Sequence, residues 1–244
     1  MSGRVLREGA ILAAGEGSRL REDGWTMSKP LVPVKGVPLI EHVVENFLAA
    51  GIGRLSIIFN AREEECARFV RSRFRDADIR ILLKTTASSL ESYREIAAML
   101  SPGPALVSTV DAWCLRADFV EFARRAAEAS AEETVLAVTP FVADEKPLRV
   151  RLGPGGLVTA IGGDSGDAVT AGIYVFPERV RNLPAPAALG RLREYLAWLV
   201  ERGETVRGIS IKEVVDVDRA SDIRLAESLS SGRPIGLVPG GGKP

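Results

Sequence analysis

Short apolar runs alternate with longer segments of helical periodicity through the first half of the chain. The runs GAILAAG, RLSIIFN, IRILLK and ALVSTV contain many β-branched residues and have the length of strands. Between them lie PLIEHVVENFLAAG, REEECARFVRSRF and SSLESYREIAAML, in which apolar residues recur at helical spacing. This repetition predicts a three-layer α-β-α arrangement, in which helices cover both faces of a mainly parallel sheet.

The second half of the chain departs from this alternation. After a helix near DFVEFARRAAEA come TVLAVTPF, LRVRLGPGGLVTAI and AVTAGIYVF, which read as strands linked by glycine-rich turns. The tetrad GPGG at 153–156 predicts the turn of a β-hairpin. A final helix, strand and helix are expected in LGRLREYLAWLVERG, VRGISIKEVVDV and ASDIRLAESLS. We therefore expect an α/β fold whose Rossmann-like, mainly parallel sheet contains an inserted β-hairpin region.

Length and composition limit the classes of protein that this chain can represent. Its 244 residues, 46% of them hydrophobic, favour a single domain at 1–230, followed by a flexible tail or linker stub at 231–244. The 32 basic residues equal the 32 acidic ones, so no overall positive field would hold nucleic acid or an anionic membrane. Cys66 and Cys114 are isolated from each other and from the single histidine, His42, which argues against a disulfide framework or a zinc cluster.

Neither a membrane span nor a signal peptide is visible in the chain. No apolar run approaches about 18 residues, and the N-terminal segment MSGRVLREGA has no apolar core. We expect a soluble, cytoplasmic protein without nucleic-acid or membrane partners. Homo-oligomerisation stays open.

The segment AILAAGEGSRL places two glycines directly after the first expected strand. Because glycine lacks a Cβ, backbone N–H groups at Gly15 and Gly17 can approach phosphate oxygens closely and can adopt positive φ. The same glycines would also suit an ordinary strand-to-helix turn. Two known nucleotide loops fail on spacing: a dinucleotide-binding G-x-G-x-x-G needs glycine where Leu20 stands, and a P-loop needs glycine-lysine-serine/threonine.

Two cations follow the glycine pair. Arg19 and Lys29 would suit a triphosphate, although such residues in a surface loop are usually solvated. Taken together, LAAGEGSRL and SKPLVPVKGVPLI resemble the signature of the nucleotidyltransferases that make nucleoside-diphosphate sugars and related activated alcohols, the NDP-sugar pyrophosphorylase and MobA-like type. That signature is L-x-x-G-x-G-T/S-R followed by P-K-P-L-x-P-V-x-G-x-P-L, and the chain departs from it at Ser28, where the family commonly has proline. AGIYVF at 171–176 and VDVDRASDIRLAE at 215–227 resemble later segments of the family.

The resemblance implies transfer of a nucleoside monophosphate from a nucleoside triphosphate to a small phosphorylated molecule, with a sugar 1-phosphate favoured and pyrophosphate released. In such a reaction Arg19 would contact the β- and γ-phosphates, and Lys29 would stabilise charge at the α-phosphorus. The nucleotide-binding residues that we expect are Leu12, Ala13, Ala14, Gly15, Glu16, Gly17, Ser18, Arg19, Lys29, Ser88 and Ser89. The hydroxyls of Ser88 and Ser89 would either hydrogen-bond an edge of the base or cap the helix that begins there.

Joining two phosphates calls for a divalent cation, Mg²⁺ or Mn²⁺, held by carboxylates. Asp111 directly follows the strand ALVSTV and would stand at the carboxyl edge of the sheet, although a turn-forming role fits its position equally well. Asp218 matches the second metal ligand of the family, with capping of the next helix by Asp218 or Ser221 as the alternative. Asp216 would point to the same face if the strand continued, and is the reserve ligand.

The base and the acceptor stay open at this point. Sugar-type members often carry a glycine-threonine/leucine-alanine segment near the base, whereas this chain has KTTASSLESYREI. A cytidylyltransferase for a non-sugar alcohol phosphate or phosphonate, of the phosphocholine type, is therefore the main alternative. A catalytically silent nucleotide-binding regulator would have lost Lys29 or the metal-binding acids, and an NAD-dependent oxidoreductase fails at Leu20.

Overall fold

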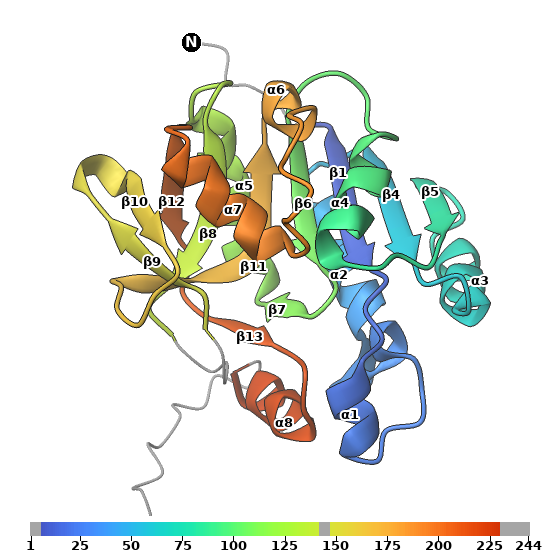
Figure 1. The fold of residues 1–244 in the computed structure, drawn as a ribbon. Coiled ribbons are helices and arrows are strands. Elements are labelled where there is room, and N and C mark those ends of the chain that lie inside the picture. Colours follow the sequence, from blue (N-terminus) through green and yellow to red (C-terminus); the bar gives the residue numbers. More distant parts are fainter. Residues whose placement is uncertain (1–5, 142–146, 230–244) are drawn as a thin grey trace, which may run out of the picture.

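The computed structural model describes residues 6–141 and 147–229. Its centre is a nine-stranded sheet in the order β10-β9-β11-β6-β1-β4-β5, in which β8 pairs with β11 and with β12 (Figure 1). The strands of this sheet are β1 (Glu8–Ala13), β4 (Arg54–Phe59), β5 (Asp78–Leu83), β6 (Ala105–Thr109), β8 (Thr134–Thr139), β9 (Arg149–Leu152), β10 (Val158–Ile161), β11 (Ala168–Phe176) and β12 (Val206–Ser210). Pairing is parallel from β6 through β1 and β4 to β5, which confirms the mainly parallel α/β sheet.

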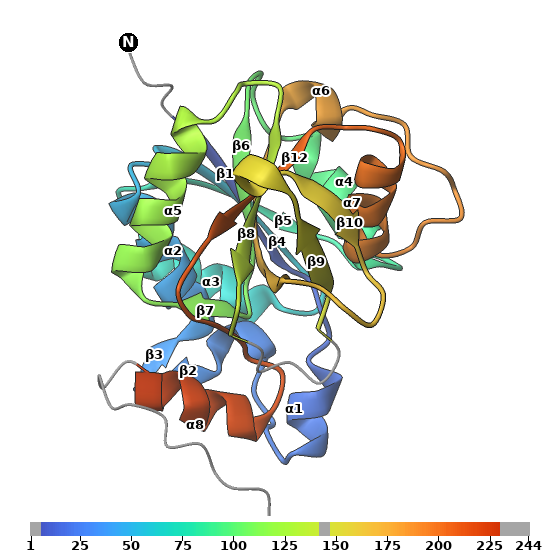
Figure 2. The ribbon, with the colours of Figure 1, turned by 90° about the vertical axis from the view of Figure 1, so that its left-hand side faces the viewer.

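Helices cover both faces of this sheet (Figure 2). On one face lie α2 (Leu39–Ala49), α3 (Glu64–Arg73) and α5 (Arg116–Glu128), and on the other α4 (Ser89–Ala97), α6 (Glu178–Arg181) and α7 (Leu192–Glu201). Two clusters of buried apolar side chains fill the spaces between the sheet and these helix layers. The apolar stripes of the helices thus face the sheet, and the predicted three-layer arrangement is confirmed.

Smaller elements lie beyond the carboxyl edge of the sheet, at the bottom of Figure 1. They are α1 (Ser18–Glu22), the 3-10 turn η1 (Lys29–Leu31), the pair β2 (Pro33–Val34) and β3 (Val37–Pro38), the pair β7 (Ala112–Cys114) and β13 (Val214–Asp216), and α8 (Ala220–Leu229). The expectation of one strand in VRGISIKEVVDV is wrong, because the chain leaves the main sheet after β12 and pairs again, as β13, with β7.

The predicted hairpin is confirmed, since β9 and β10 pair antiparallel around the short turn η2 (Pro154–Gly156). Strand β11 runs antiparallel to β6, β8 and β9, and its register against β8 shifts between Thr170 and Tyr174. Gly172, inside this shift, has a φ of 71°, and a Cβ there would lie 2.7 Å from Thr109 Oγ1. Glycine therefore lets β11 pass close to the turn that carries Asp111.

Two expectations concern features outside this architecture. The predicted tail at 231–244 lies outside the described residues. Within 6–141 and 147–229, no helix combines the length and the apolar character needed to cross a bilayer.

Candidate active site

A cavity of about 950 Å³ opens where β1, β4, β5, β6 and β8 reach their carboxyl ends. Parallel α/β sheets bind ligands at this edge. The predicted nucleotide-binding residues that line the cavity are Leu12, Ala14, Gly15, Glu16, Gly17, Ser18, Arg19, Lys29, Ser88 and Ser89. The side chain of Ala13 is instead buried in the apolar core.

The loop between β1 and α1 packs closely against the side chain of Lys29. Gly17 precedes α1 in the left-handed conformation, and a Cβ there would lie 2.8 Å from the Cβ of Lys29. Gly15 has open space around its α-carbon, so its backbone stays accessible from the cavity. Ser28, where the chain departs from the family signature, donates a 2.7 Å hydrogen bond to Glu65 on α3 and so ties the lysine-bearing turn to that helix. Gly17 is thus the glycine that the geometry requires.

The ammonium of Lys29 lies between two carboxylates. The side chain is 7% exposed, and its Nζ donates to Asp111 Oδ2 at 2.6 Å and to Asp218 Oδ1. Burial alone would lower the pKa of Lys29, but the charges of Asp111, Asp218 and Asp216 outweigh it and raise the pKa above its ordinary value. A permanent positive charge therefore lies in the cavity wall.

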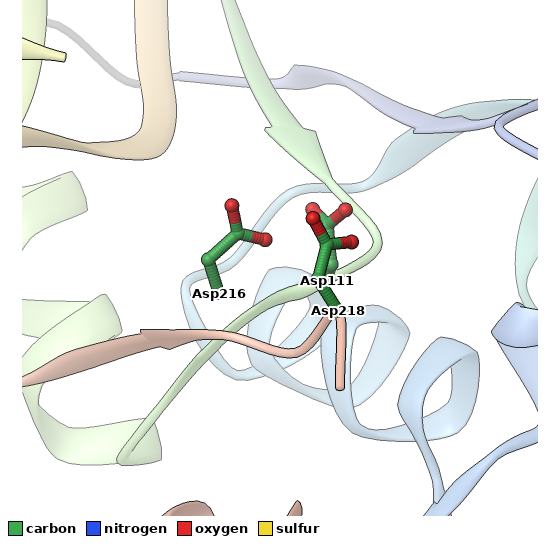
Figure 3. Close-up of side chains that lie close together, drawn as sticks. All are labelled: Asp111, Asp216 and Asp218. Carbon is green, nitrogen blue, oxygen red and sulfur yellow. The ribbon is translucent and has the colours of Figure 1, made fainter. Parts of the chain in front are cut away.

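The two carboxylates that hold Lys29 belong to a group of three aspartates, which Figure 3 shows close together. Asp111 follows β6, Asp216 ends β13 and Asp218 comes two residues later, and an oxygen from each lies within 4.8 Å of the others. The β7–β13 pair brings them together, because Asp216 is in register with Ala112 and Val217 N donates to Asp111 O at 3.0 Å. Burial by itself would raise the pKa of the Asp111 carboxyl, but the charge and hydrogen bond of Lys29 lower it by more. The pKa therefore lies below its ordinary value, and the carboxyl stays ionised.

The carboxylate of Asp218 is directed at cations rather than at the start of α8. Besides Lys29, it accepts a 2.8 Å hydrogen bond from Nη1 of Arg19. The amides at the beginning of α8 are satisfied by other acids, since Ala220 N donates to Asp23 at 2.9 Å and Asp218 N donates to Asp222 at 3.0 Å. The capping role considered for Asp218 therefore falls to Asp23 and Asp222.

Polar, uncharged side chains form one part of the cavity. Its lining includes Asn60 after β4, Thr85 and Thr86 after β5, and the serines 88, 89 and 92 at the start of α4. Ser88 Oγ accepts from Glu91 N at 3.2 Å and caps α4, while Ser89 Oγ accepts from Leu192 N at 3.0 Å. Both serines thus have structural roles in addition to lining the cavity.

Arginines and an aromatic ring line the α7 side of the cavity, directly beside Ser89, whose Oγ accepts from Leu192 N between the two arginines. Arg191 and Arg193, at the start of α7, line it together with Thr170 and Tyr174 of β11. Burial raises the pKa of the Tyr174 phenol, and the nearby charges of Asp216 and Asp111 raise it further. Sequence reasoning assigned neither the lining residues Arg191, Arg193, Thr170 and Tyr174 nor Asn60, Thr85 and Thr86 to a site. For the last three, the available signal was their position just after β4 and β5, the two strands that follow β1 outward in the sheet.

Comparison with known proteins agrees with this geometry. The family model described as the MobA-like NTP transferase domain matches residues 9–201. Among curated proteins, the chain is 40% identical over 63 residues to a glucose-1-phosphate thymidylyltransferase of Actinoplanes sp., a match covering 26% of this chain and 20% of that protein. It is 38% identical over 55 residues to a 2-aminoethylphosphonate cytidylyltransferase of Lancefieldella rimae, covering 22% of each. Only about a fifth of the length of these two relatives is therefore matched.

A solved structure shares the whole fold. The inositol-1-phosphate CTP transferase from T. maritima superposes with a TM-score of 0.81, covering 96% of this chain and 100% of that one, at 17% sequence identity. At this identity the likeness establishes the fold alone.

Proposed function

Because the chain belongs to the family of MobA-like NTP transferase domains, we propose that it transfers a nucleoside monophosphate from a nucleoside triphosphate to a small phosphorylated acceptor and releases pyrophosphate. A sugar 1-phosphate is the favoured acceptor, in keeping with the thymidylyltransferase relative, which is named for glucose 1-phosphate. The observation that carries the proposal is the meeting of Lys29, Arg19 and three aspartates beside a glycine loop in one cavity. The acceptor's own phosphate oxygen is the nucleophile, so the reaction needs charge stabilisation rather than a nucleophilic side chain.

In this proposal the triphosphate lies against the glycine loop. Gly15 leaves the backbone open on the cavity side, and Gly17 lets the loop fold against Lys29. Arg19 contacts the β- and γ-phosphates that leave as pyrophosphate, since its planar donors suit phosphate oxygens. Lys29 stabilises the negative charge that grows around the α-phosphorus as the acceptor oxygen attacks.

The acidic cluster fits a divalent cation such as Mg²⁺ or Mn²⁺. Asp111, Asp216 and Asp218 each offer a carboxylate oxygen within 4.8 Å of the others, and hard divalent cations prefer oxygen ligands of this kind. A cation held there would supply positive charge next to the α-phosphate and orient both phosphates. Lys29 and Arg19 offset part of the negative charge of the cluster, which keeps these acids together in the apo protein.

The second candidate function is cytidylyl transfer to a non-sugar alcohol phosphate or phosphonate. It is favoured by the match to a 2-aminoethylphosphonate cytidylyltransferase and by a fold shared with an enzyme named as an inositol-1-phosphate CTP transferase. A silent regulator is disfavoured, because Lys29 and the three aspartates are retained and brought together.

The test is a pyrophosphate-release assay with CTP, GTP, UTP, ATP and dTTP in the presence of Mg²⁺. Each nucleotide is paired with glucose 1-phosphate, mannose 1-phosphate, inositol 1-phosphate, phosphocholine and 2-aminoethylphosphonate. We expect at least one pair to release pyrophosphate only when both substrates are present. Identical release from wild type and from the Lys29→Ala and Asp111→Asn variants would rule out this site assignment, and release from no pair would count against the activity itself.

A further inference from the structure

The amide of Asn60 is held in one orientation in the wall of the cavity. Its Oδ1 accepts hydrogen bonds from Arg62 N at 3.2 Å and from Thr85 Oγ1 at 3.1 Å. A backbone N–H can only donate, so the amide atom facing Arg62 must be the oxygen. Asn60 is 9% exposed and lines the cavity, and the part of its side chain left for a ligand is the NH₂ group, with two donors.

The hydroxyl hydrogens of the two threonines next to Asn60 already take part in hydrogen bonds within the protein. Thr85 donates its hydrogen to Asn60 Oδ1. Thr86 Oγ1 lies 2.6 Å from Ser92 Oγ, and Ser92 Oγ in turn donates to Ser88 O at 3.2 Å. Since Ser92 has a single hydroxyl hydrogen, both of its contacts are hydrogen bonds only if Thr86 donates to Ser92. Thr85 and Thr86 therefore offer oxygen lone pairs, and no hydrogen, to the cavity.

Asn60, Thr85 and Thr86 form a part of the lining without charge, and the arginines of α7 border it on the side of Ser89. The charged residues among the described lining are Glu16 on the glycine loop, Arg19 on α1, Lys29, the three aspartates, and the two arginines of α7. Asn60 follows β4, which lies beside β1, and Thr85 follows β5, the next strand outward, so both are on the side of β1 that is away from β11. A neutral, hydrogen-bonding group attached to the triphosphate fits there better than a phosphate does.

We propose that Asn60, Thr85 and Thr86 favour nucleotide bases with an exocyclic amino group and discriminate against uracil and thymine, an inference that rests on the proposed function. The two hydrogens of one amino group pair with the two threonine oxygens, and a ring carbonyl or ring nitrogen accepts from the Asn60 amide. Uracil and thymine have a single N–H on this edge, flanked by two carbonyl oxygens. At least one threonine oxygen would then face another acceptor without a hydrogen between them, which costs more at the half-buried Thr86 than at the exposed Thr85.

The test compares matched nucleotides by titration calorimetry on the wild-type chain with Mg²⁺. CTP is compared with UTP and with the triphosphate of zebularine, a cytidine analogue without the 4-amino group, and GTP is compared with ITP, which lacks the 2-amino group. ATP and dTTP are measured as well, so that all five bases are compared and the amino-bearing base that binds most tightly is identified. We expect the best amino-bearing nucleotide to bind at least about tenfold more tightly than its matched analogue and than UTP or dTTP.

Two variants locate the effect. Thr86→Val keeps the branched shape and removes the oxygen, so it should reduce the ratio between the matched nucleotides toward one. Thr86→Ser keeps the oxygen and should retain the ratio. UTP or dTTP binding as tightly as the best amino-bearing nucleotide, or an equal loss for every nucleotide in Thr86→Val, would overturn the inference and leave the proposed transfer standing. Absence of binding by every triphosphate would overturn the proposed function as well.

Discussion

Replacing Lys29 with methionine tests the charge balance of the site, because methionine keeps most of the length of the side chain and removes its charge. Lys29 is 7% exposed, and the side chains of Asp111 and Asp218 are 22% and 30% exposed. Removing one partner of a buried ion pair costs about 3–5 kcal/mol, whereas exposed pairs are worth at most about 1 kcal/mol. These acids are partly solvated, so we expect the free energy of unfolding without divalent cations to fall by about 2 kcal/mol. Urea unfolding at neutral pH measures this loss.

The same substitution has a larger expected effect on the reaction. Removing one preorganised group that stabilises transition-state charge costs about a hundred- to a thousandfold in kcat. Pyrophosphate release at saturating substrates measures kcat, and circular dichroism confirms that the variant is folded. Lys84→Met is the matched control, since Lys84 forms an exposed ion pair with Glu95 at 2.8 Å and lies outside the described cavity lining. Wild-type kcat in the folded Lys29 variant would show that Lys29 does not stabilise charge in the transition state.

Three further predictions follow from individual contacts. Gly17→Ala should lose about 1–2 kcal/mol of stability and bind triphosphate more weakly, because the φ of Gly17 is 61° and the new Cβ would lie 2.8 Å from the Lys29 side chain. Thermal melting measures the stability, and titration calorimetry measures the binding. In both experiments the control Gly53→Ala should be nearly neutral, because a Cβ at Gly53 meets nothing within 4 Å. Asp111→Asn should weaken the thermal shift produced by Mg²⁺, and an unchanged Mg²⁺ titration would remove Asp111 from the metal site. A hydrogen bond from Arg179 lowers the pKa of Glu204, so its stabilising effect is present above the unfolded pKa and is lost as pH falls through the folded value. The difference in urea midpoint between wild type and Glu204→Gln should therefore shrink on acidification, and a constant difference would contradict this ion-pair role.

The sequence predicted the parts of the site that lie in one long signature. Gly15, Gly17, Arg19 and Lys29 fall within 15 residues along the chain, and the structure brings all of them to the cavity. The spatial convergence of Asp111 with the distant aspartates was expected only through the family resemblance. It depends on the β7–β13 pair, whose three-residue strands are too short to produce a recognisable periodicity.

Other features depend on tertiary contacts that no local pattern reports. The segment VRGISIKEVVDV looks like one strand because its apolar residues continue through the break, yet β12 and β13 belong to different sheets. Asn60, Thr85 and Thr86 resemble ordinary turn residues until β4 and β5 place them in the wall of the cavity. Their hydrogen-bond directions become evident only from the contacts to Arg62 and Ser92.

The proposed function requires that the α-phosphate of the nucleotide, and not the γ-phosphate, passes to the acceptor. It is tested by incubating the protein with Mg²⁺, a phosphorylated acceptor and the best-bound nucleotide, labelled with ³²P either at the α- or at the γ-position, and then separating the products. We predict that the α-label appears in the acceptor product and the γ-label in pyrophosphate, and that both signals fall about a hundredfold or more in Lys29→Met. Transfer of the γ-label to the acceptor, or release of the γ-label as inorganic phosphate without any α-labelled product, would contradict the account.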